Sequence, residues 1–234
     1  MVLTGTIVNG LAIIVAALIG LKIKNIPEQM KTTVLQAIAL AVIILGISMG
    51  LKSEQFLIVI SSLVIGTVIG EKLNLENRLN QVGLWIESKI GAKEEGKVAK
   101  AFVTTTLIYV VGAMAIIGAL DSGLRGDHSV LYTKAMLDGV SSLIFASTLG
   151  VGVVFSAIPV ILYQGMIALL ATQINAFISE ELLDLLIIEL TGTGGILIVA
   201  IGLNILGLTK IKVANMLPSI VVVSILVLLF SNFS

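Results

Sequence analysis

The stretch LTGTIVNGLAIIVAALIGL, residues 3–21, decides the fold class, because it is long, apolar and free of charged side chains. A bilayer core about 30 Å thick is crossed by roughly 20 apolar residues in a helix. The apolar residues are continuous rather than alternating, which is typical of a membrane helix and not of a barrel strand. No basic segment precedes them, so we expect a retained transmembrane helix rather than a cleaved signal peptide.

The whole composition agrees with this first helix. Of 234 residues, 57% are hydrophobic and 12% are charged, whereas a soluble domain has about 25% charged residues. The 14 basic and 14 acidic residues balance, which gives no reason to expect a nucleic-acid partner. Cysteine is absent and histidine occurs once, so we expect no thiolate or multi-histidine metal site and no cofactor. The composition predicts an all-α membrane protein, a single integral membrane domain over residues 1–234, with the lipid bilayer as its main partner.

Hydropathy divides the chain into about eight transmembrane helices. They are expected near residues 3–21, 33–51, 56–70, 98–120, 139–157, 159–177, 190–208 and 213–231. The break at residues 156–159 has almost no charge, so residues 139–157 and 159–177 would alternatively form a re-entrant pair.

The basic residues favour eight spans over the re-entrant alternative. With eight spans, 11 of the 14 basic residues lie on one side, and only Lys52, Arg125 and Lys134 lie on the other. With a re-entrant pair, the division becomes 9 against 5. The positive-inside rule then predicts a multi-pass membrane protein with its basic loops in the cytoplasm.

Some stretches are expected to lie on the membrane. Residues 72–95 form a cytoplasmic interfacial amphipathic helix in this interpretation, with Leu75, Val82 and Ile86 at helical spacing and Trp85 near headgroup depth. Such a helix more often only connects two spans. Residues 179–189 and 129–137 are further short amphipathic candidates on the outer side, the first with Ser179 as N-cap.

An internal repeat relates the two ends of the chain. Laying residues 1–70 over residues 156–226 places Asn9-Gly10 on Gln164-Gly165 and, with the offset increased by one residue, Gly46-Ile47-Ser48 on Gly202-Leu203-Asn204. In the eight-span topology, helices 1–3 and 6–8 run in opposite directions, and the central helices at residues 98–157, with their acidic outer loop, lie between them. The second repeat covers residues 159–231. Inverted repeats are the architecture of many secondary transporters, although apolar sequences also align by chance.

Polar residues within or beside the apolar spans are the candidates for a site, because an unpaired polar group is costly in lipid. Asp121 and Asp138 abut apolar spans and would bind a proton, a cation or a cationic solute, although Asp138 would also serve as a helix cap. The amides occupy comparable depths in the two repeats. The substrate- or ion-binding candidates are Asn9, Gln36, Asp121, Asp138, Ser141, Gln164, Thr191, Thr193 and Asn204.

Glycine patterns add two expectations. Gly46-xxx-Gly50 and Gly66-xxx-Gly70 are small-residue faces for close helix packing, and packing within the chain is favoured over dimerisation. The run TGTGG at residues 191–195 has three glycines, each of which weakens a helix by about 1 kcal/mol. We therefore expect a broken helix there, of the kind that exposes backbone groups to a transported solute.

Several strings resemble a known family over essentially the whole chain. They are GTIVN (residues 5–9), GAMAIIGALDSG (112–123), KAMLDG (134–139), FSAIP (155–159) and YQG (163–165). They are similar to bacterial integral membrane proteins of the domain of unknown function 554 family. The resemblance implies a bacterial inner-membrane protein for which transport is the usual suggestion. It implies no substrate and no catalytic residue.

The leading hypothesis is a secondary transporter or permease for a small solute or ion, working by alternating access between inverted repeats. A passive ion channel or pore is one alternative, and a non-transporting membrane regulator acting through residues 72–95 is another. An enzyme is not expected, because the sequence has no metal-ligand spacing and no nucleophile motif. An eight-helix chain is small for enclosing a pathway alone, which favours a homodimer.

Overall fold

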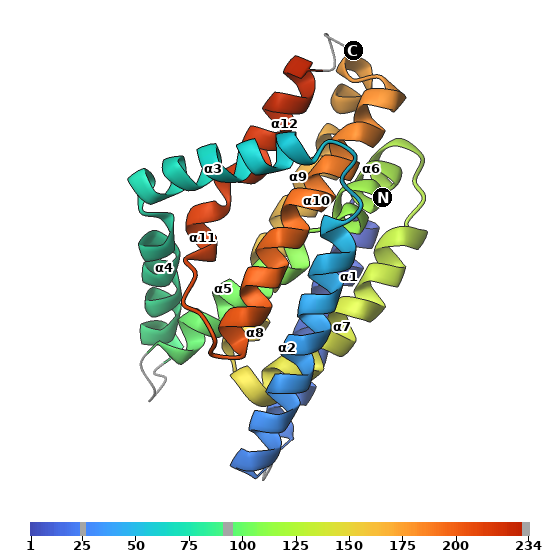
Figure 1. Ribbon diagram of the computed structural model, residues 1–234. Helices are drawn as coiled ribbons and strands as arrows, with labels where there is room; N and C mark the ends of the chain where they lie inside the picture. The colour runs from blue at the N-terminus through green and yellow to red at the C-terminus, as the bar shows by residue number, and fades with distance from the viewer. Residues whose placement is uncertain (24–26, 91–95, 231–234) are drawn as a thin grey trace. The chain divides into compact units, whose positions relative to one another are not determined.

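The structure is a computed structural model that describes residues 1–23, 27–90 and 96–230, and the regular structure in these ranges is helical. This confirms the all-α fold class. The helices are α1 (Thr4–Lys22), α2 (Glu28–Gly50), α3 (Phe56–Leu73), α4 (Leu75–Ile90), α5 (Lys97–Val110), α6 (Ala113–Leu124), α7 (Ser129–Leu149), α8 (Gly152–Phe155), α9 (Ala157–Phe177), α10 (Glu180–Ile205), α11 (Val213–Met216) and α12 (Pro218–Phe230) (Figure 1).

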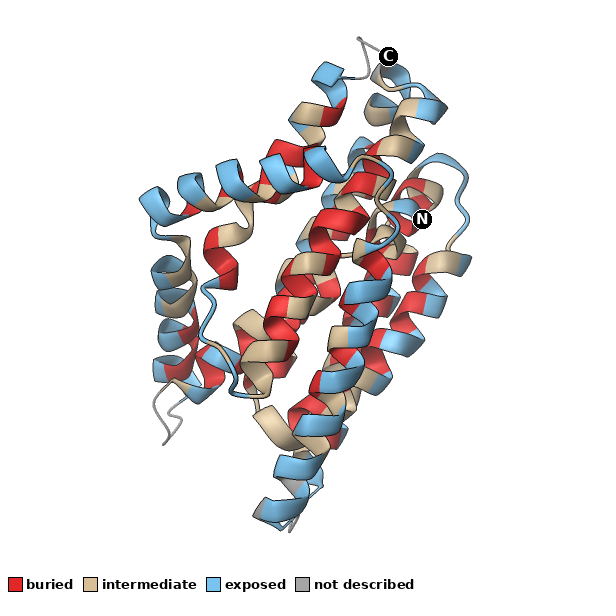
Figure 2. Ribbon diagram, viewed as in Figure 1, coloured by how far each residue is buried: buried red, intermediate tan, exposed pale blue. Residues whose placement is uncertain are grey.

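Six stretches of the described chain are long and apolar enough to cross a membrane. They are Thr4–Lys22, Thr32–Gly50, Phe56–Leu73, Gly152–Ala176, Glu181–Ile205 and Val213–Phe230, and α5 with α6 would add a seventh as one bent span. In five of the six, no more than 39% of the most apolar window is buried. Large apolar side chains such as Leu57, Val64 and Ile44 are exposed along these helices (Figure 2), as contact with lipid requires.

The structure corrects the central part of the predicted topology. The span expected at residues 98–120 is two helices, α5 and α6, with a bend of 62° between them. Gly112 lies at this bend with φ +147°, a conformation that side chains rarely adopt. Residues 139–157, expected as one span, are not one helix: α7 begins ten residues earlier at Ser129 and ends before Gly150, where φ is +92°, and α8 follows. The interfacial helix expected at residues 129–137 is therefore the first half of α7.

The second half of the chain holds another correction. α10 runs without interruption from Glu180 to Ile205, so the predicted break at residues 191–195 is wrong, and residues 179–189 are not a separate helix. The predicted N-cap is confirmed, because the Ser179 hydroxyl accepts a hydrogen bond from the Leu182 amide. The glycines of α10 lie where backbones approach closely: a Cβ on Gly195 would lie 2.4 Å from the Gly50 nitrogen. Close packing of this kind outweighs the low helix propensity of glycine.

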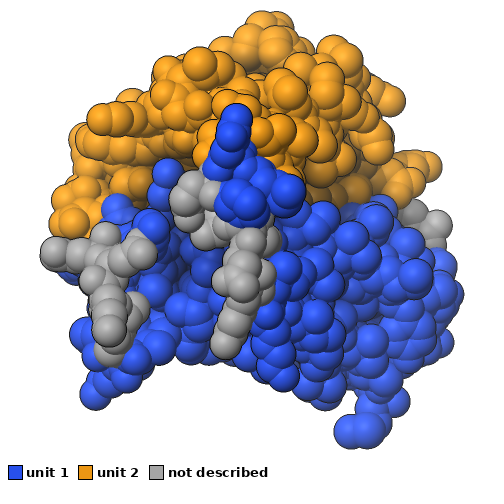
Figure 3. Space-filling view, turned by 90° about the horizontal axis from the view of Figure 1, so that it is seen from below, with its two compact units in different colours: residues 1–31, 79–110, 114–177 blue, residues 32–78, 111–113, 178–234 orange. Residues whose placement is uncertain are grey.

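The chain divides into two compact units, coloured separately in Figure 3. Unit 1 contains residues 1–31, 79–110 and 114–177, and unit 2 contains residues 32–78, 111–113 and 178–234. Each unit therefore combines segments that are far apart in the sequence.

Unit 1 is built around α1. α7 runs parallel to it along its whole length, since Gly5 packs on Leu131 near one end and Gly20 packs on Leu143 near the other. α9 runs antiparallel to α1, since Gly10 packs on Ile161 and Gly165 packs on Thr6. These small residues allow the close helix approach that membrane packing favours.

Unit 2 consists of two antiparallel helix pairs. α2 pairs with α10, and Gly46 and Gly50 both face α10. α3 pairs with α12 and α11, since Gly66 packs on Ser219 and Gly70 packs on Asn215. Both small-residue faces are thus used for packing within the chain, as expected.

Candidate functional site

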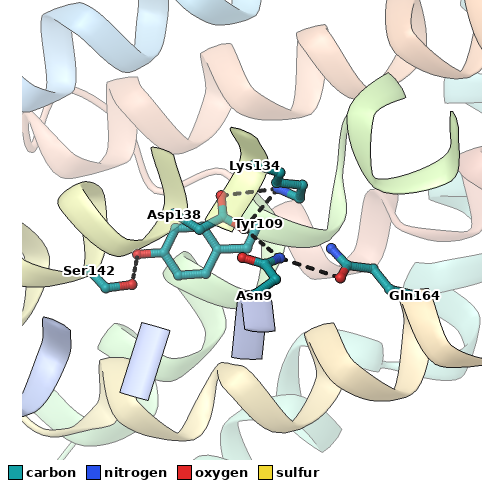
Figure 4. A network of polar contacts seen from close by, with 6 residues as sticks. All are labelled: Asn9, Tyr109, Lys134, Asp138, Ser142 and Gln164. Carbon is teal, nitrogen blue, oxygen red and sulfur yellow. Dashed lines mark hydrogen bonds and ion pairs between the residues drawn. The ribbon is translucent and has the colours of Figure 1, made fainter. Parts of the chain in front are cut away.

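A buried ion pair lies inside unit 1 (Figure 4). Lys134 and Asp138 both belong to α7, and their i,i+4 spacing places them on one face of the helix. The Lys134 ammonium lies 3.0 Å from Oδ1 and 2.9 Å from Oδ2 of Asp138. Each side chain is only 9% exposed. A charge with so little water around it is stable only with a close partner, so each of these residues depends on the other.

Two amides extend the ion pair towards α1 and α9. The Asn9 Nδ2 group donates to Asp138 Oδ2 at 3.0 Å and to Gln164 Oε1 at 3.3 Å. Asn9 and Gln164 are both fully buried. α1 therefore meets α7 and α9, which lie more than 100 residues later in the sequence, through a continuous chain of polar contacts.

The same region contains buried polar atoms that have no hydrogen-bond partner among the described residues. They are Oδ1 of Asn9, Nε2 of Gln164 and Oγ1 of Thr6, and Thr6 is also fully buried. A buried polar group without a partner costs roughly 1–3 kcal/mol. One acceptor, one amide donor and one hydroxyl are thus available for a water molecule or a small polar solute.

Tyr109 and Ser142 form a second buried polar contact in unit 1. The Ser142 hydroxyl donates to the Tyr109 hydroxyl at 2.8 Å, and both residues are almost completely buried. Ser142 lies one helical turn beyond Asp138 on α7. The Tyr109 ring also packs against Phe145, with ring centroids 6.5 Å apart. This contact fixes α5 against α7 beside the ion pair.

The polar loop between α6 and α7 is held mainly by its own residues. Asp121 of α6 pairs at 3.5 Å with Arg125, the residue that directly follows α6. Ser122 contacts the His128 ring nitrogen Nδ1. The Ser129 backbone amide donates to Asp127 at 2.9 Å and holds the pKa of Asp127 below its usual value. Asp121 is thus paired locally, with a residue just beyond the end of its own helix.

The structure brings together only part of the predicted set of site residues. Asn9, Asp138 and Gln164 lie in one polar network, and Asp138 lies inside α7, so its predicted role as a helix cap is wrong. Ser141 is half-buried next to Ser142. Gln36 is exposed on α2.

The remaining predicted residues belong to α10 in unit 2. The Thr191 hydroxyl donates to the Ile187 carbonyl of its own helix. Thr193 is fully buried, and its hydroxyl has no partner in the described part of the chain. The Asn204 amide closes the turn after α10 by bonding to Thr209 and to the backbone of Ile211.

Sequence reasoning missed several buried charged residues, among them Lys134 and Glu189. Lys134 was assigned to the outer loop because α7 was expected to begin after it. Glu189 was assigned to an acidic surface helix, but it is fully buried. Its carboxylate accepts hydrogen bonds from the Ser53 hydroxyl and from the Glu54 and Gln55 amides, just before α3. For Lys134, the i,i+4 spacing from Asp138 was the sequence signal that could have revealed the buried pair.

A further polar cluster in unit 2 joins the α3–α4 corner to α11. Asn215 accepts from the Glu76 backbone amide at 2.7 Å, and Glu76 in turn accepts from the Ala214 amide at 2.9 Å. The Lys212 ammonium donates to Glu71 at 2.7 Å, and this hydrogen bond raises the pKa of Lys212. The backbone bonds satisfy amides at the starts of α4 and α11, so the cluster has a structural role. Among the described residues, no group of three acidic, histidine or cysteine side chains has the geometry to hold a metal ion.

Comparisons with known proteins agree with a membrane protein. The model of the family "Protein of unknown function (DUF554)" matches residues 4–228. The chain is 32% identical to the uncharacterized membrane protein YdfK of Bacillus subtilis (strain 168), covering 98% of this chain and 97% of YdfK. It is 27% identical to the uncharacterized protein YqgA of Escherichia coli (strain K12), covering 92% of each chain. No solved structure matches. With its apolar helices and these bacterial relatives, the chain is a multi-pass membrane protein and belongs to the DUF554 family.

Proposed function

We propose that this protein is a secondary transporter for a small polar solute or ion, and that the solute binds at Asn9, Asp138 and Gln164. The observation that carries the proposal is the buried Lys134–Asp138 ion pair, which Asn9 joins to Gln164. Ionisable residues inside membrane proteins usually mark the paths of solutes or protons. The unpartnered atoms of Asn9, Gln164 and Thr6 supply the polar contacts that a small solute needs.

The α1–α9 packing supports an inverted repeat. The alignment of the repeats makes Asn9 equivalent to Gln164, Gly10 to Gly165 and Thr6 to Ile161. Gly10 packs on Ile161, and its equivalent Gly165 packs on Thr6. Exchanging the two repeats turns the Gly10–Ile161 contact into the Gly165–Thr6 contact. The same exchange turns the Asn9–Gln164 contact into itself. A two-fold axis between antiparallel helices produces this pattern.

The α2–α10 packing follows the same rule. The alignment makes Gly46 equivalent to Gly202, Ala39 to Gly195 and Ile43 to Val199. A Cβ on Gly46 would lie 2.7 Å from the Gly195 oxygen and from the Val199 nitrogen. A Cβ on Gly202 would lie 3.0 Å from the Ala39 oxygen and 3.2 Å from the Ile43 nitrogen. The contacts of Gly46 with α10 are therefore repeated by the equivalent contacts of Gly202 with α2. A chance alignment would rarely reproduce both contacts.

The third pair, α3 and α12, is also antiparallel, since Gly66 faces Ser219 and Gly70 faces Asn215. Inverted repeats allow alternating access, because two similar halves exchange conformations around a site near the membrane midplane. Asn9 and Gln164, at the centre of this symmetry, are then the natural position for the solute.

We propose eight spans, with α5–α6 as one bent span and α7 as another. Polar residues such as Lys134 and Asp138 lower the hydropathy of α7. However, α7 packs beside α1 from Gly5 to Gly20. A helix that runs beside a membrane span over this length crosses the same thickness. The proposal places the basic loops in the cytoplasm of a bacterial inner membrane.

Asp138 has a specific role in the proposed mechanism. Its carboxylate is shared between Lys134 and Asn9, so a proton, a cation or the cationic group of a solute would replace one of these partners. Release of Asn9 would also change its hydrogen bond with Gln164. Binding on α7 would thereby reach both α1 and α9. We propose transport rather than catalysis, because no nucleophile motif accompanies the carboxylate in the sequence.

The proposal is tested with the purified full chain in proteoliposomes. Uptake is measured for a panel of radiolabelled amino acids, sugars, carboxylates and monovalent cations, with and without a pH gradient. We expect at least one solute to accumulate with the wild type, and Asp138→Asn to abolish this uptake. Asp184→Asn is the matched control, because Asp184 is exposed on α10 in unit 2. Uptake that is equal in wild type and Asp138→Asn would overturn the proposed site.

A further inference from the structure

An apolar groove in unit 1 lies outside the polar network. Its volume is about 430 Å³, and its walls come from α4, α5, α8 and α9. Trp85, Ile90, Phe102, Phe155 and Ile158 are among the apolar lining residues, and Lys89 is the one charged residue among them. Ligand pockets are typically about 300–1,000 Å³, so the groove is large enough for an organic ligand but small for a partner helix.

The groove is held open by tight packing beneath it. A Cβ on Gly83 of α4 would lie 2.4 Å from the Ala99 Cβ, so α4 lies directly on α5. Ile86, Val98 and Phe102 form a buried apolar cluster under the groove. The Glu87 carboxylate accepts from the Gly96 amide at 2.9 Å, which fixes the end of α4 relative to the start of α5. The α4 and α5 walls of the groove are therefore packed directly against each other.

The exposed side chains at the groove have the character of a membrane–water interface. Trp85 is 62% exposed, and tryptophan is enriched at headgroup depth. Lys89 is exposed one turn further along α4 and has no ion-pair partner in the part of the chain that the structure describes. Glu87 is directed at Gly96, and residues two apart do not face each other on a helix. The groove thus combines a deep apolar surface with one free positive charge at its edge.

We propose that this groove is a binding site for an anionic phospholipid of the bilayer. One acyl chain fills the apolar groove, and the lipid phosphate contacts the Lys89 ammonium. An anionic headgroup is complementary to the unpaired charge, and an acyl chain is complementary to the apolar walls. Each basic residue near the membrane surface contributes attraction to anionic lipids. A zwitterionic lipid would fill the groove but gain less from Lys89.

Trp85 provides a direct test, because it lines the groove and is the chain's only tryptophan. The full chain is reconstituted in phosphatidylcholine vesicles that contain a small fraction of lipid with brominated acyl chains, which quench tryptophan fluorescence. The brominated lipid is either phosphatidylglycerol or phosphatidylcholine. We expect phosphatidylglycerol to quench at a mole fraction about five-fold lower, from the attraction of one lysine.

Variants separate the headgroup contact from the acyl-chain contact. Lys89→Gln should remove the preference for phosphatidylglycerol, whereas Lys72→Gln, which removes an exposed charge from α3 in unit 2, should keep it. Val82→Phe, which narrows the groove, should weaken quenching by both lipids, whereas Val68→Phe on α3 should not. Equal quenching by the two lipids in the wild type would overturn the anionic headgroup. An unchanged preference in Lys89→Gln would overturn the Lys89 contact, and unchanged quenching in Val82→Phe would overturn the acyl-chain site.

Discussion

Asn9 and Gln164 share a single amide–amide hydrogen bond of 3.3 Å, and each keeps its other amide atom without a partner among the described residues. The two residues lie on α1 and α9, which run antiparallel. In the proposed inverted repeat, their positions correspond in the two halves of the chain. In that proposal, such a polar pair, with unused hydrogen-bonding capacity, is a natural meeting point for a solute that must be approached from both sides.

The Asn9–Gln164 hydrogen bond should contribute little to the free energy of unfolding. Interhelical hydrogen bonds in membrane proteins contribute about 0.6 kcal/mol on average. In a double-mutant cycle with Asn9→Ala and Gln164→Ala, we expect a coupling free energy of about 0.6 kcal/mol. The measurement is unfolding in sodium dodecyl sulfate micelles. Strictly additive effects of the two substitutions would mean that the hydrogen bond is absent from the folded protein.

The Lys134–Asp138 ion pair should behave as a unit. Removing one partner leaves an unpaired buried charge, so we expect Lys134→Met to lower the free energy of unfolding by about 3–5 kcal/mol. The double variant Lys134→Met with Asp138→Leu removes both charges and should recover most of this loss. Thermal stability in detergent, followed by size-exclusion chromatography, measures both effects. A double variant less stable than either single variant would show that the two charges are not paired.

The α2–α10 register can be tested by a disulfide, because the chain contains no cysteine. A Cβ on Gly192 would lie 2.8 Å from the Ser53 Cβ, so a small outward shift of the backbone would bring the two Cβ atoms to the roughly 3.5–4.5 Å of a disulfide. Oxidation of the Ser53→Cys/Gly192→Cys variant should therefore protect both thiols from maleimide-polyethylene glycol. The Ser53→Cys/Thr209→Cys variant is the control, since Thr209 follows the opposite end of α10. Complete labelling of the first pair after oxidation would contradict the antiparallel register.

Glu189 should contribute to stability although it belongs to no proposed solute site. Its carboxylate satisfies two backbone amides and one hydroxyl before α3. Replacing it by leucine leaves these donors unpaired, and each buried unpaired donor costs roughly 1–3 kcal/mol. We expect Glu189→Leu to lose several-fold more stability than Glu181→Leu, which changes an exposed position on the same helix. Equal thermal stability of the two variants would exclude the capping role.

The sequence predicts the membrane class and most helices well, because a long apolar run has few alternatives to a membrane helix. It failed where packing decides the structure. Charged and polar residues hid the first half of α7, although Lys134 and Asp138 neutralise each other within that helix. Glycines suggested a break in α10, but they allow close packing instead: Gly195 lies on α2, Gly192 on Ser53 and Gly194 on Val111.

The sequence predicted only part of the candidate site, again because helix packing decides which residues meet. Alignment of the two halves pointed to Asn9 and Gln164 as equivalent residues, and apolar surroundings marked Asp138. Lys134 could not be placed in the site without the correct start of α7. The sequence also could not separate Asn9 and Gln164 from Gln36 and Asn204, because depth along a helix does not determine which side of the helix a residue occupies.

Counterflow in proteoliposomes is the most direct test of transport at the Asn9–Asp138–Gln164 site. Vesicles are preloaded with an unlabelled solute identified by the uptake panel, and entry of the labelled solute is followed over time. Alternating access predicts that preloading accelerates entry in wild type and in Asp184→Asn, and that Asp138→Asn shows no such acceleration. Entry that is independent of preloading, or acceleration that is unchanged in Asp138→Asn, would contradict the account.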